Sequence, residues 1–139
     1  MSSPGKNDSA TGHCLCGAVN FRIVGPLRPL VSACHCSQCR RFHGAPGAYT
    51  AAAESDVIID GRDSIRWYSS SPDVRRGFCM TCGTTLFWQE IGAKELDIVA
   101  GTIDLPSGLK LARHIYVASK GDYEVIADGL PQFPASSRG

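Results

Sequence analysis

The chain has 139 residues, of which 43% are hydrophobic and 19% are charged, and its formal net charge is +1. This size and composition suit one folded domain with a hydrophobic core. The near-neutral charge disfavours nucleic acid as a partner, because a nucleic-acid groove normally needs a basic excess. No apolar run reaches the roughly 18 residues of a membrane span, and the polar N-terminus lacks the apolar core of a signal peptide. We therefore expect a cytoplasmic protein with no membrane partner.

Short segments rich in β-branched and aromatic residues alternate with glycine and proline along most of the chain. The only predicted helical turn lies at residues 37–44, with Ser37 as its N-cap and Gly44 as its stop. Many short strands separated by turns predict a mainly β fold, either a sandwich or an open barrel. In chain order the predicted strands are residues 18–24, 30–34, 47–53, 56–60, 64–69, 74–79, 84–90, 95–103, 114–117 and 123–127.

Seven cysteines form three tight clusters along the chain: Cys14 and Cys16, then Cys34, Cys36 and Cys39, then Cys79 and Cys82. The odd number excludes a complete set of disulfides within one chain. In a protein expected in a reducing compartment, such clustering indicates metal binding before disulfides.

The first and third clusters together contain enough thiols for one closed zinc site. Cys79 and Cys82 have the Cys-x₂-Cys spacing of a zinc knuckle. A redox role is less consistent, since a strand is predicted after them instead of the helix expected for a redox motif. Cys14 and Cys16 are two residues apart, so an extended segment turns both thiols to one side. Four thiolates make a structural zinc site, for which His13 is an alternative ligand.

The second cluster, Cys34, Cys36 and Cys39, has three thiols and no obvious fourth ligand. Three protein ligands with one open position are the pattern of catalytic zinc. Two histidines are alternative fourth ligands. His35 is expected to point away from its flanking cysteines on a strand, whereas His43 could approach the ion from a helical turn.

The order of the three motifs resembles the family of glutathione-dependent formaldehyde-activating enzymes, whose domain is shared with centromere protein V. The motifs are CLCG (14–17), CHCSQCR (34–40) and FCMTCG (78–83), and the segments GTIDLP (101–106) and HIYVASK (114–120) are also similar. The resemblance implies one zinc-binding domain at residues 12–134. The polar composition outside it predicts a flexible tail (1–11) and a frayed C-terminus (135–139).

The resemblance further implies an Mss4-like fold of stacked β-sheets and two zinc ions per chain, the second held more weakly by its three ligands. The structural zinc falls on Cys14, Cys16, Cys79 and Cys82, and the catalytic zinc on Cys34, Cys36 and Cys39. This partition is the same one that the spacing indicates.

The activity implied by the resemblance is a carbon–sulfur lyase reaction, in which glutathione and formaldehyde combine reversibly to S-(hydroxymethyl)glutathione. Glutathione would then be the small-molecule partner. Four arginines flank the clusters and would either offset thiolate charge or bind its carboxylates: Arg40, Arg41, Arg75 and Arg76. Three aromatic residues would either wall a pocket or pack in the core: Phe42, Trp67 and Tyr68.

Two other functions fit the same motifs. The first is a non-catalytic zinc module that binds a protein or a nucleic acid, and the second is metal or thiol sensing through the three-cysteine cluster. The oligomeric state does not follow from the sequence.

Overall fold

A small antiparallel sheet forms one side of the protein, whose computed structural model describes residues 8–136. Its strands are β1 (Ala10–His13), β2 (Asn20–Ile23) and β5 (Val57–Asp60), in the order β1-β2-β5. Along β2, Phe21 and Ile23 are buried while Asn20 and Arg22 are exposed. This alternation is typical of a sheet with one face on the core and the other toward solvent.

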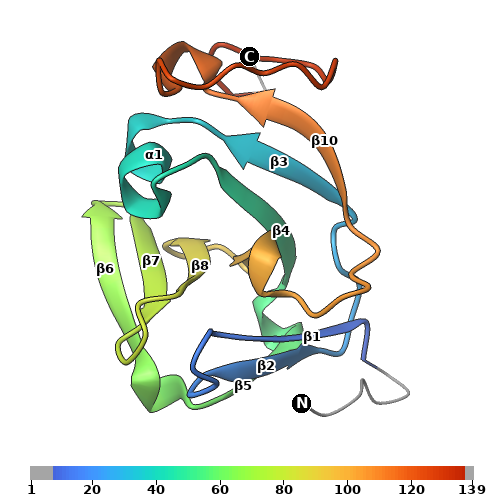
Figure 1. Cartoon of the computed structure of the whole chain (residues 1–139). Helices are drawn as coiled ribbons and strands as arrows, with labels where there is room; N and C mark the ends of the chain where they lie inside the picture. Colours follow the sequence, from blue (N-terminus) through green and yellow to red (C-terminus); the bar gives the residue numbers. More distant parts are fainter. Residues whose placement is uncertain (1–7, 137–139) are drawn as a thin grey trace.

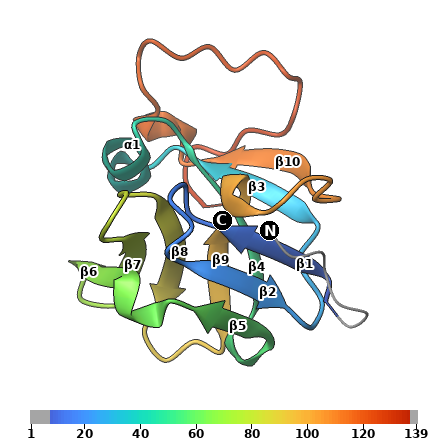
Figure 2. The same cartoon turned by 60° about the horizontal axis from the view of Figure 1, so that its bottom comes forward.

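A larger sheet runs in the order β10-β3-β4-β9-β8-β7-β6. Neighbouring strands are antiparallel except β10 and β3, which run parallel. Figure 2 shows the small sheet lying across β4, β8 and β9. The strands of the larger sheet are β3 (Leu30–Cys34), β4 (Gly47–Ala53), β6 (Ile65–Ser71), β7 (Val74–Cys79), β8 (Thr85–Glu90), β9 (Glu95–Val99) and β10 (Lys110–Ile115).

The hydrophobic core lies between the two sheets. Phe21 of β2 meets Phe87 of β8 edge to face, with ring centroids 5.5 Å apart. Cys14 and Cys79 belong to the same core and are fully buried. The first and third cysteine clusters are therefore joined where the two sheets pack together.

A single short α-helix, α1 (Ser37–His43), is found in residues 8–136, beside the end of β3 (Figure 1). The predicted N-cap, Ser37, is wrong by one residue, because Cys36 Sγ accepts a hydrogen bond from the Cys39 backbone N–H at 3.3 Å. The predicted stop at Gly44 is confirmed, since its φ of 77° is left-handed. Four 3₁₀ turns lie at Glu54–Asp56, Arg62–Ser64, Ala100–Thr102 and Val117–Ser119.

The mainly β prediction is confirmed, and the strands predicted at 30–34, 47–53 and 74–79 have the same bounds as β3, β4 and β7. The strand predicted at 123–127 is wrong. Tyr123 and Val125 face solvent, being 70% and 85% exposed, and no partner strand pairs with this segment. The strand predicted at 95–103 ends at Val99, where a 3₁₀ turn begins.

The chain ends differ from the predicted boundaries. Ala10 and Thr11 belong to β1, which pairs with β2, so strand structure includes part of the predicted tail of residues 1–11. Ala135 accepts a backbone hydrogen bond from Tyr116 at 2.9 Å, inside the predicted frayed end of residues 135–139. Residues 1–7 and 137–139 lie outside the described residues. None of the described helices has the length and hydrophobicity needed to cross a membrane.

Candidate functional site

The first and third cysteine clusters meet at one point, although they are more than sixty residues apart in sequence. The Sγ atoms of Cys14, Cys16, Cys79 and Cys82 all lie within 4.8 Å of one another. Cys16 Sγ is 3.7 Å from Cys14 Sγ and 3.8 Å from Cys79 Sγ. A tetrahedral ion with Zn–S bonds near 2.3 Å requires sulfur separations of about 3.8 Å. The four thiols therefore fit one metal ion.

Polar groups around this four-cysteine cluster favour the thiolate at Cys82. The pKa of Cys16 is instead raised to about 11, because burial and the three neighbouring thiols outweigh the hydrogen bond from the Ala18 N–H. Backbone N–H groups of Val19 and Ala18 donate to the sulfurs of Cys14 and Cys16, at 3.3 and 3.5 Å. The Thr84 hydroxyl lies 3.2 Å from Cys82 Sγ, and mainly this contact lowers the pKa of Cys82 to about 5. The thiolate is the form that binds metal.

His13, the alternative ligand for this cluster, has both ring nitrogens directed elsewhere. Its Nδ1 donates to the Cys14 carbonyl at 2.6 Å, and its Nε2 lies 3.5 Å from the Asp104 carboxylate. The ring therefore lies alongside the cluster without joining it.

The second cluster is assembled at the junction of β3 and α1. Cys34 ends β3, Cys36 caps α1 and Cys39 lies in its first turn, with all three Sγ atoms within 4.8 Å of one another. Hydrogen bonds from Cys34 and Cys39 lower the pKa of Cys36. The pKa of Cys34 is raised, because Cys34 contacts the thiols of Cys36 and Cys39. Three neighbouring thiols therefore resist losing all their protons unless a cation compensates their charge. This donor set fits a metal ion.

His43, a predicted alternative fourth ligand, is occupied by other partners. Its Nδ1 is 3.0 Å from Thr85 Oγ1, and its Nε2 accepts a hydrogen bond from the Tyr49 hydroxyl. Burial lowers the pKa of His43 to about 4 and raises the pKa of Tyr49, so both groups are neutral near pH 7.

His35 points away from its flanking cysteines, as the strand geometry predicts. It is buried, and its Nε2 lies 2.8 Å from Nδ1 of His114. Glu124 lies 3.2 Å from the other end of His35, and Asp128 accepts a hydrogen bond from His114 Nε2 at 2.7 Å. These contacts tie the irregular segment after β10 to the large sheet. Sequence reasoning missed this row of four contacting side chains because the residues are far apart in sequence.

Within the part of the chain that the structure describes, Cys34, Cys36 and Cys39 therefore form a group of three sulfurs without a fourth protein ligand. Among residues 8–136, no histidine, cysteine or carboxylate completes this cluster. Such an arrangement leaves one coordination position for an exchangeable ligand.

One of the four flanking arginines reaches the three-cysteine cluster. Arg76 is 3% exposed, and its Nη1 and Nη2 lie 3.6 and 3.7 Å from Cys39 Sγ. Arg75 instead stacks on Trp67, 3.9 Å from the ring centroid, and Arg40 donates to the Ser119 carbonyl at 3.2 Å.

The aromatic residues divide between core and surface. Trp67 stacks on Phe87 at the edge of the core, and Phe42 packs against Phe78. Tyr68 is 60% exposed. Packing thus accounts for Trp67 and Phe42, and the sequence alone did not decide this.

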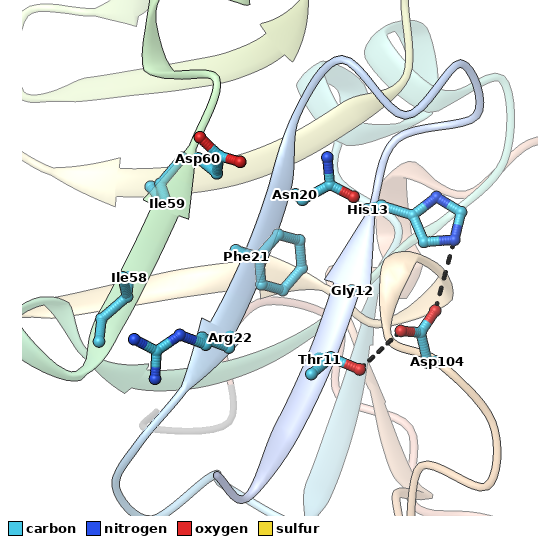
Figure 3. A pocket seen from close by; sticks show the side chains of 10 residues that line it. All are labelled: Thr11, Gly12, His13, Asn20, Phe21, Arg22, Ile58, Ile59, Asp60 and Asp104. Carbon is cyan, nitrogen blue, oxygen red and sulfur yellow. Dashed lines mark hydrogen bonds and ion pairs between the residues drawn. The ribbon is translucent and has the colours of Figure 1, made fainter. Parts of the chain in front are cut away.

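A groove of about 410 Å³ lies on the solvent face of the small sheet, and no cysteine lines it (Figure 3). Within it, Asp104 accepts a hydrogen bond from Thr11 at 2.6 Å. No sequence motif predicts this groove, since its wall forms only when three strands pair in register. Its polar lining residues are Thr11, His13, Asn20, Arg22, Asp60 and Asp104.

Comparison with known proteins gives two curated relatives of similar sequence. An uncharacterized lyase of Schizosaccharomyces pombe is 30% identical over 83 residues, which cover 60% of this chain. A Halomonas elongata protein, provisionally named a glutathione-dependent formaldehyde-activating enzyme, is 32% identical over 92 residues, which cover 58% of this chain. The chain spans 59% of the length of each relative.

A solved structure supports the fold. The crystal structure of a Rhodobacter sphaeroides protein superposes with a TM-score of 0.59 at 20% identity, covering 88% of this chain and 98% of that one. The family described as glutathione-dependent formaldehyde-activating enzyme matches residues 9–119, a range that contains all seven cysteines. Because this match covers well over half of the sequence, the chain belongs to the glutathione-dependent formaldehyde-activating enzyme family.

Proposed function

We propose that the protein is a zinc-dependent enzyme of the carbon–sulfur lyase type, which combines glutathione with formaldehyde to S-(hydroxymethyl)glutathione and catalyses the reverse cleavage. In the forward direction the thiol sulfur bonds to the carbonyl carbon, and the carbonyl oxygen takes up the proton that the thiol loses. The observation that carries this proposal is the cluster of Cys34, Cys36 and Cys39, which has no fourth protein ligand among the described residues.

We assign a structural zinc to the four-cysteine cluster and a catalytic zinc to the three-cysteine cluster. A zinc ion held by three thiolates supplies Lewis acidity and favours the deprotonated form of a substrate thiol. The protein contributes the environment of that position. His43 and Tyr49 are neutral and bonded to each other beside the cluster, so neither adds charge where the thiol would enter.

The proposed contacts for the substrate carboxylates are two cations beside α1. Arg40 and Lys120 line a small hollow together with His35 and Tyr123. Glu124 also lines this hollow, which has no room for a ligand group, so a carboxylate of glutathione would pair with Arg40 and Lys120 from the surface. Arg75 is a weaker choice because it is already stacked on Trp67 and bonded to Gln89. We also propose a cytoplasmic location, which the seven free cysteines support.

The test is adduct exchange measured by NMR. Zinc-loaded protein is mixed with glutathione and formaldehyde, and we expect exchange between free and adduct signals faster than the spontaneous rate. Cys36→Ser should abolish the acceleration, since it removes one ligand of the three-cysteine cluster. Exchange at the spontaneous rate in the wild type, with two zinc ions bound per chain, would refute the proposed activity.

A DNA titration distinguishes the binding-module alternative. We expect no affinity in the micromolar range, in keeping with the net charge of +1. A salt-dependent micromolar affinity for DNA, without adduct exchange, would favour the non-catalytic module.

A further inference from the structure

We propose that Arg76 is a positioning residue for the three-cysteine metal centre: its guanidinium balances the charge of that centre and fixes the thiolate of Cys39. The inference rests on metal binding at this cluster and is independent of which thiol or aldehyde reacts there. Arg76 lies on β7, and its side chain is buried against α1, where it donates to Gln38.

Every hydrogen bond of the Arg76 side chain goes to a neutral group or to a cysteine. Besides the two contacts with Cys39 Sγ at 3.6 and 3.7 Å, Nη1 donates to the Tyr49 hydroxyl at 3.4 Å. Nε donates to Ser70 Oγ at 3.1 Å, and Nη2 donates to Gln38 Oε1 at 3.3 Å. Within residues 8–136, no carboxylate forms an ion pair with Arg76.

A buried guanidinium without an anion is energetically unfavourable, because the charge loses its hydration and gains no opposite charge in return. Arginine does not escape this cost by losing its proton. The neighbouring sulfurs supply the missing anion. Three thiolates around a Zn²⁺ ion carry a formal charge of −1, so one Arg⁺ beside them makes the assembly neutral. The metal centre and Arg76 therefore complete each other electrostatically.

The hydrogen bonds also determine how Cys39 presents its sulfur. Groups that bond to metal ligands orient them and tune the metal, and their mutation typically lowers metal affinity by about 10- to 100-fold. Cys36 Sγ accepts a bond from a backbone N–H, whereas Cys39 Sγ accepts from a charged side chain. Arg76 thereby withdraws electron density from this ligand and keeps the metal receptive to an incoming fourth ligand.

The neighbouring arginine provides a matched control. Arg75 lies one residue earlier on β7, where strand geometry turns it to the opposite face. Its guanidinium stacks on Trp67 and donates to Gln89 Oε1 at 2.9 and 2.7 Å, so it contacts neither cluster. Removing either arginine changes the net charge by the same amount, but only the Arg76 substitution should reach the metal centre.

The experiment compares R76Q, R76K and R75Q with the wild type. Zinc affinity of the weaker site is measured by competition with a chromophoric chelator, and Co²⁺-substituted protein reports the sulfur-to-metal charge-transfer band. For R76Q we expect an affinity lower by about 10- to 100-fold and a band at longer wavelength, because a sulfur without these hydrogen bonds donates more strongly. R76K should lie between R76Q and the wild type, and R75Q should match the wild type.

Two results would overturn the proposal. One is a folded R76Q or R76K whose affinity and band equal those of the wild type. The other is a wild type that binds only one metal ion, since the three-cysteine centre would then not exist. A wild type that binds two ions but accelerates no adduct exchange would refute the proposed lyase function alone. The expected shifts in R76Q would still support the role of Arg76.

Discussion

The two cysteine clusters differ in what surrounds their sulfurs. In the four-cysteine cluster, Cys14 and Cys79 are fully buried in the core between the two sheets, and the nearby donors are backbone N–H groups and the Thr84 hydroxyl. In the three-cysteine cluster, Cys36 Sγ also accepts from a backbone N–H, but Cys39 Sγ accepts from the charged side chain of Arg76. The first environment suits a closed site that stabilises the fold, and the second suits a site that binds and releases a ligand.

Their positions explain this difference. The four-cysteine cluster joins the loop after β1 to the end of β7, so a metal ion there would connect both sheets. The three-cysteine cluster lies within one continuous stretch, from the end of β3 into α1 (Figure 1). A metal ion there would close only a short loop and contribute little to the overall topology. Loss of the two ions should therefore have unequal effects.

The largest expected effect comes from substituting one ligand in each cluster. Cys79→Ser opens the core site, and structural zinc contributes an apparent binding free energy of about 10–16 kcal/mol in small zinc modules. We expect this variant to lose its cooperative thermal unfolding transition and both metal ions. Cys36→Ser should keep the transition and one metal ion. Circular dichroism measures the thermal unfolding transition of each variant, and metal analysis measures its zinc stoichiometry.

The comparison fails if the two serine variants lose soluble protein to the same extent, since both clusters would then be equally structural. It also fails if Cys36→Ser retains two zinc ions. Cys82→Ser serves as a second variant of the four-cysteine cluster and should behave as Cys79→Ser does.

A smaller effect is expected from Tyr49→Phe, which tests the polar surroundings of the three-cysteine cluster. The Tyr49 hydroxyl accepts a hydrogen bond from Arg76 and donates one to His43, and it is buried. Removing it leaves both partners without one bond, at a cost of about 1–3 kcal/mol. Urea unfolding measures this loss. The matched variant Tyr68→Phe, at a side chain that is 60% exposed, should unfold as the wild type does.

Motif spacing predicted which cysteines would group together, because neighbours two or three residues apart share a face or a turn. It could not predict that Arg76 rather than Arg75 would reach Cys39, since that contact depends on how β7 packs beside α1. Nor could it predict the bond between His35 and His114, which are 79 residues apart. Metal binding itself stays a prediction, although the sulfurs lie where it requires them.

The strand errors have a similar cause. Residues 123–127 have the composition of a strand, yet Glu124 and Asp128 draw this segment onto two buried histidines instead of a sheet edge. Conversely, β1 is too polar and short to stand out in the sequence. It forms because β2 pairs with it and because Gly12 leaves room for the Phe21 ring, which would lie 2.4 Å from an added Cβ.

The smallest expected effect concerns the anchor behind the three-cysteine cluster. His114 donates a hydrogen bond to Asp128 at 2.7 Å, and this bond lowers the pKa of Asp128. A lowered carboxyl pKa stabilises the folded state above the unfolded pKa of about 3.9. This stabilisation is lost as the pH falls through the lower pKa of the folded state. Asp128→Asn should therefore lower the melting temperature slightly at pH 6, with a difference from the wild type that shrinks toward pH 2.

Thermal unfolding at a series of pH values measures this dependence, with Asp122→Asn on the same segment as the control. The Asp128 bond lies on the far side of His35 from the sulfurs, so zinc stoichiometry should remain at two in both variants. A melting difference independent of pH would show that Asp128 acts through packing. Loss of one zinc in Asp128→Asn would mean that the anchor and the three-cysteine cluster are coupled. It would contradict the view that the three-cysteine cluster depends only on the stretch from β3 into α1.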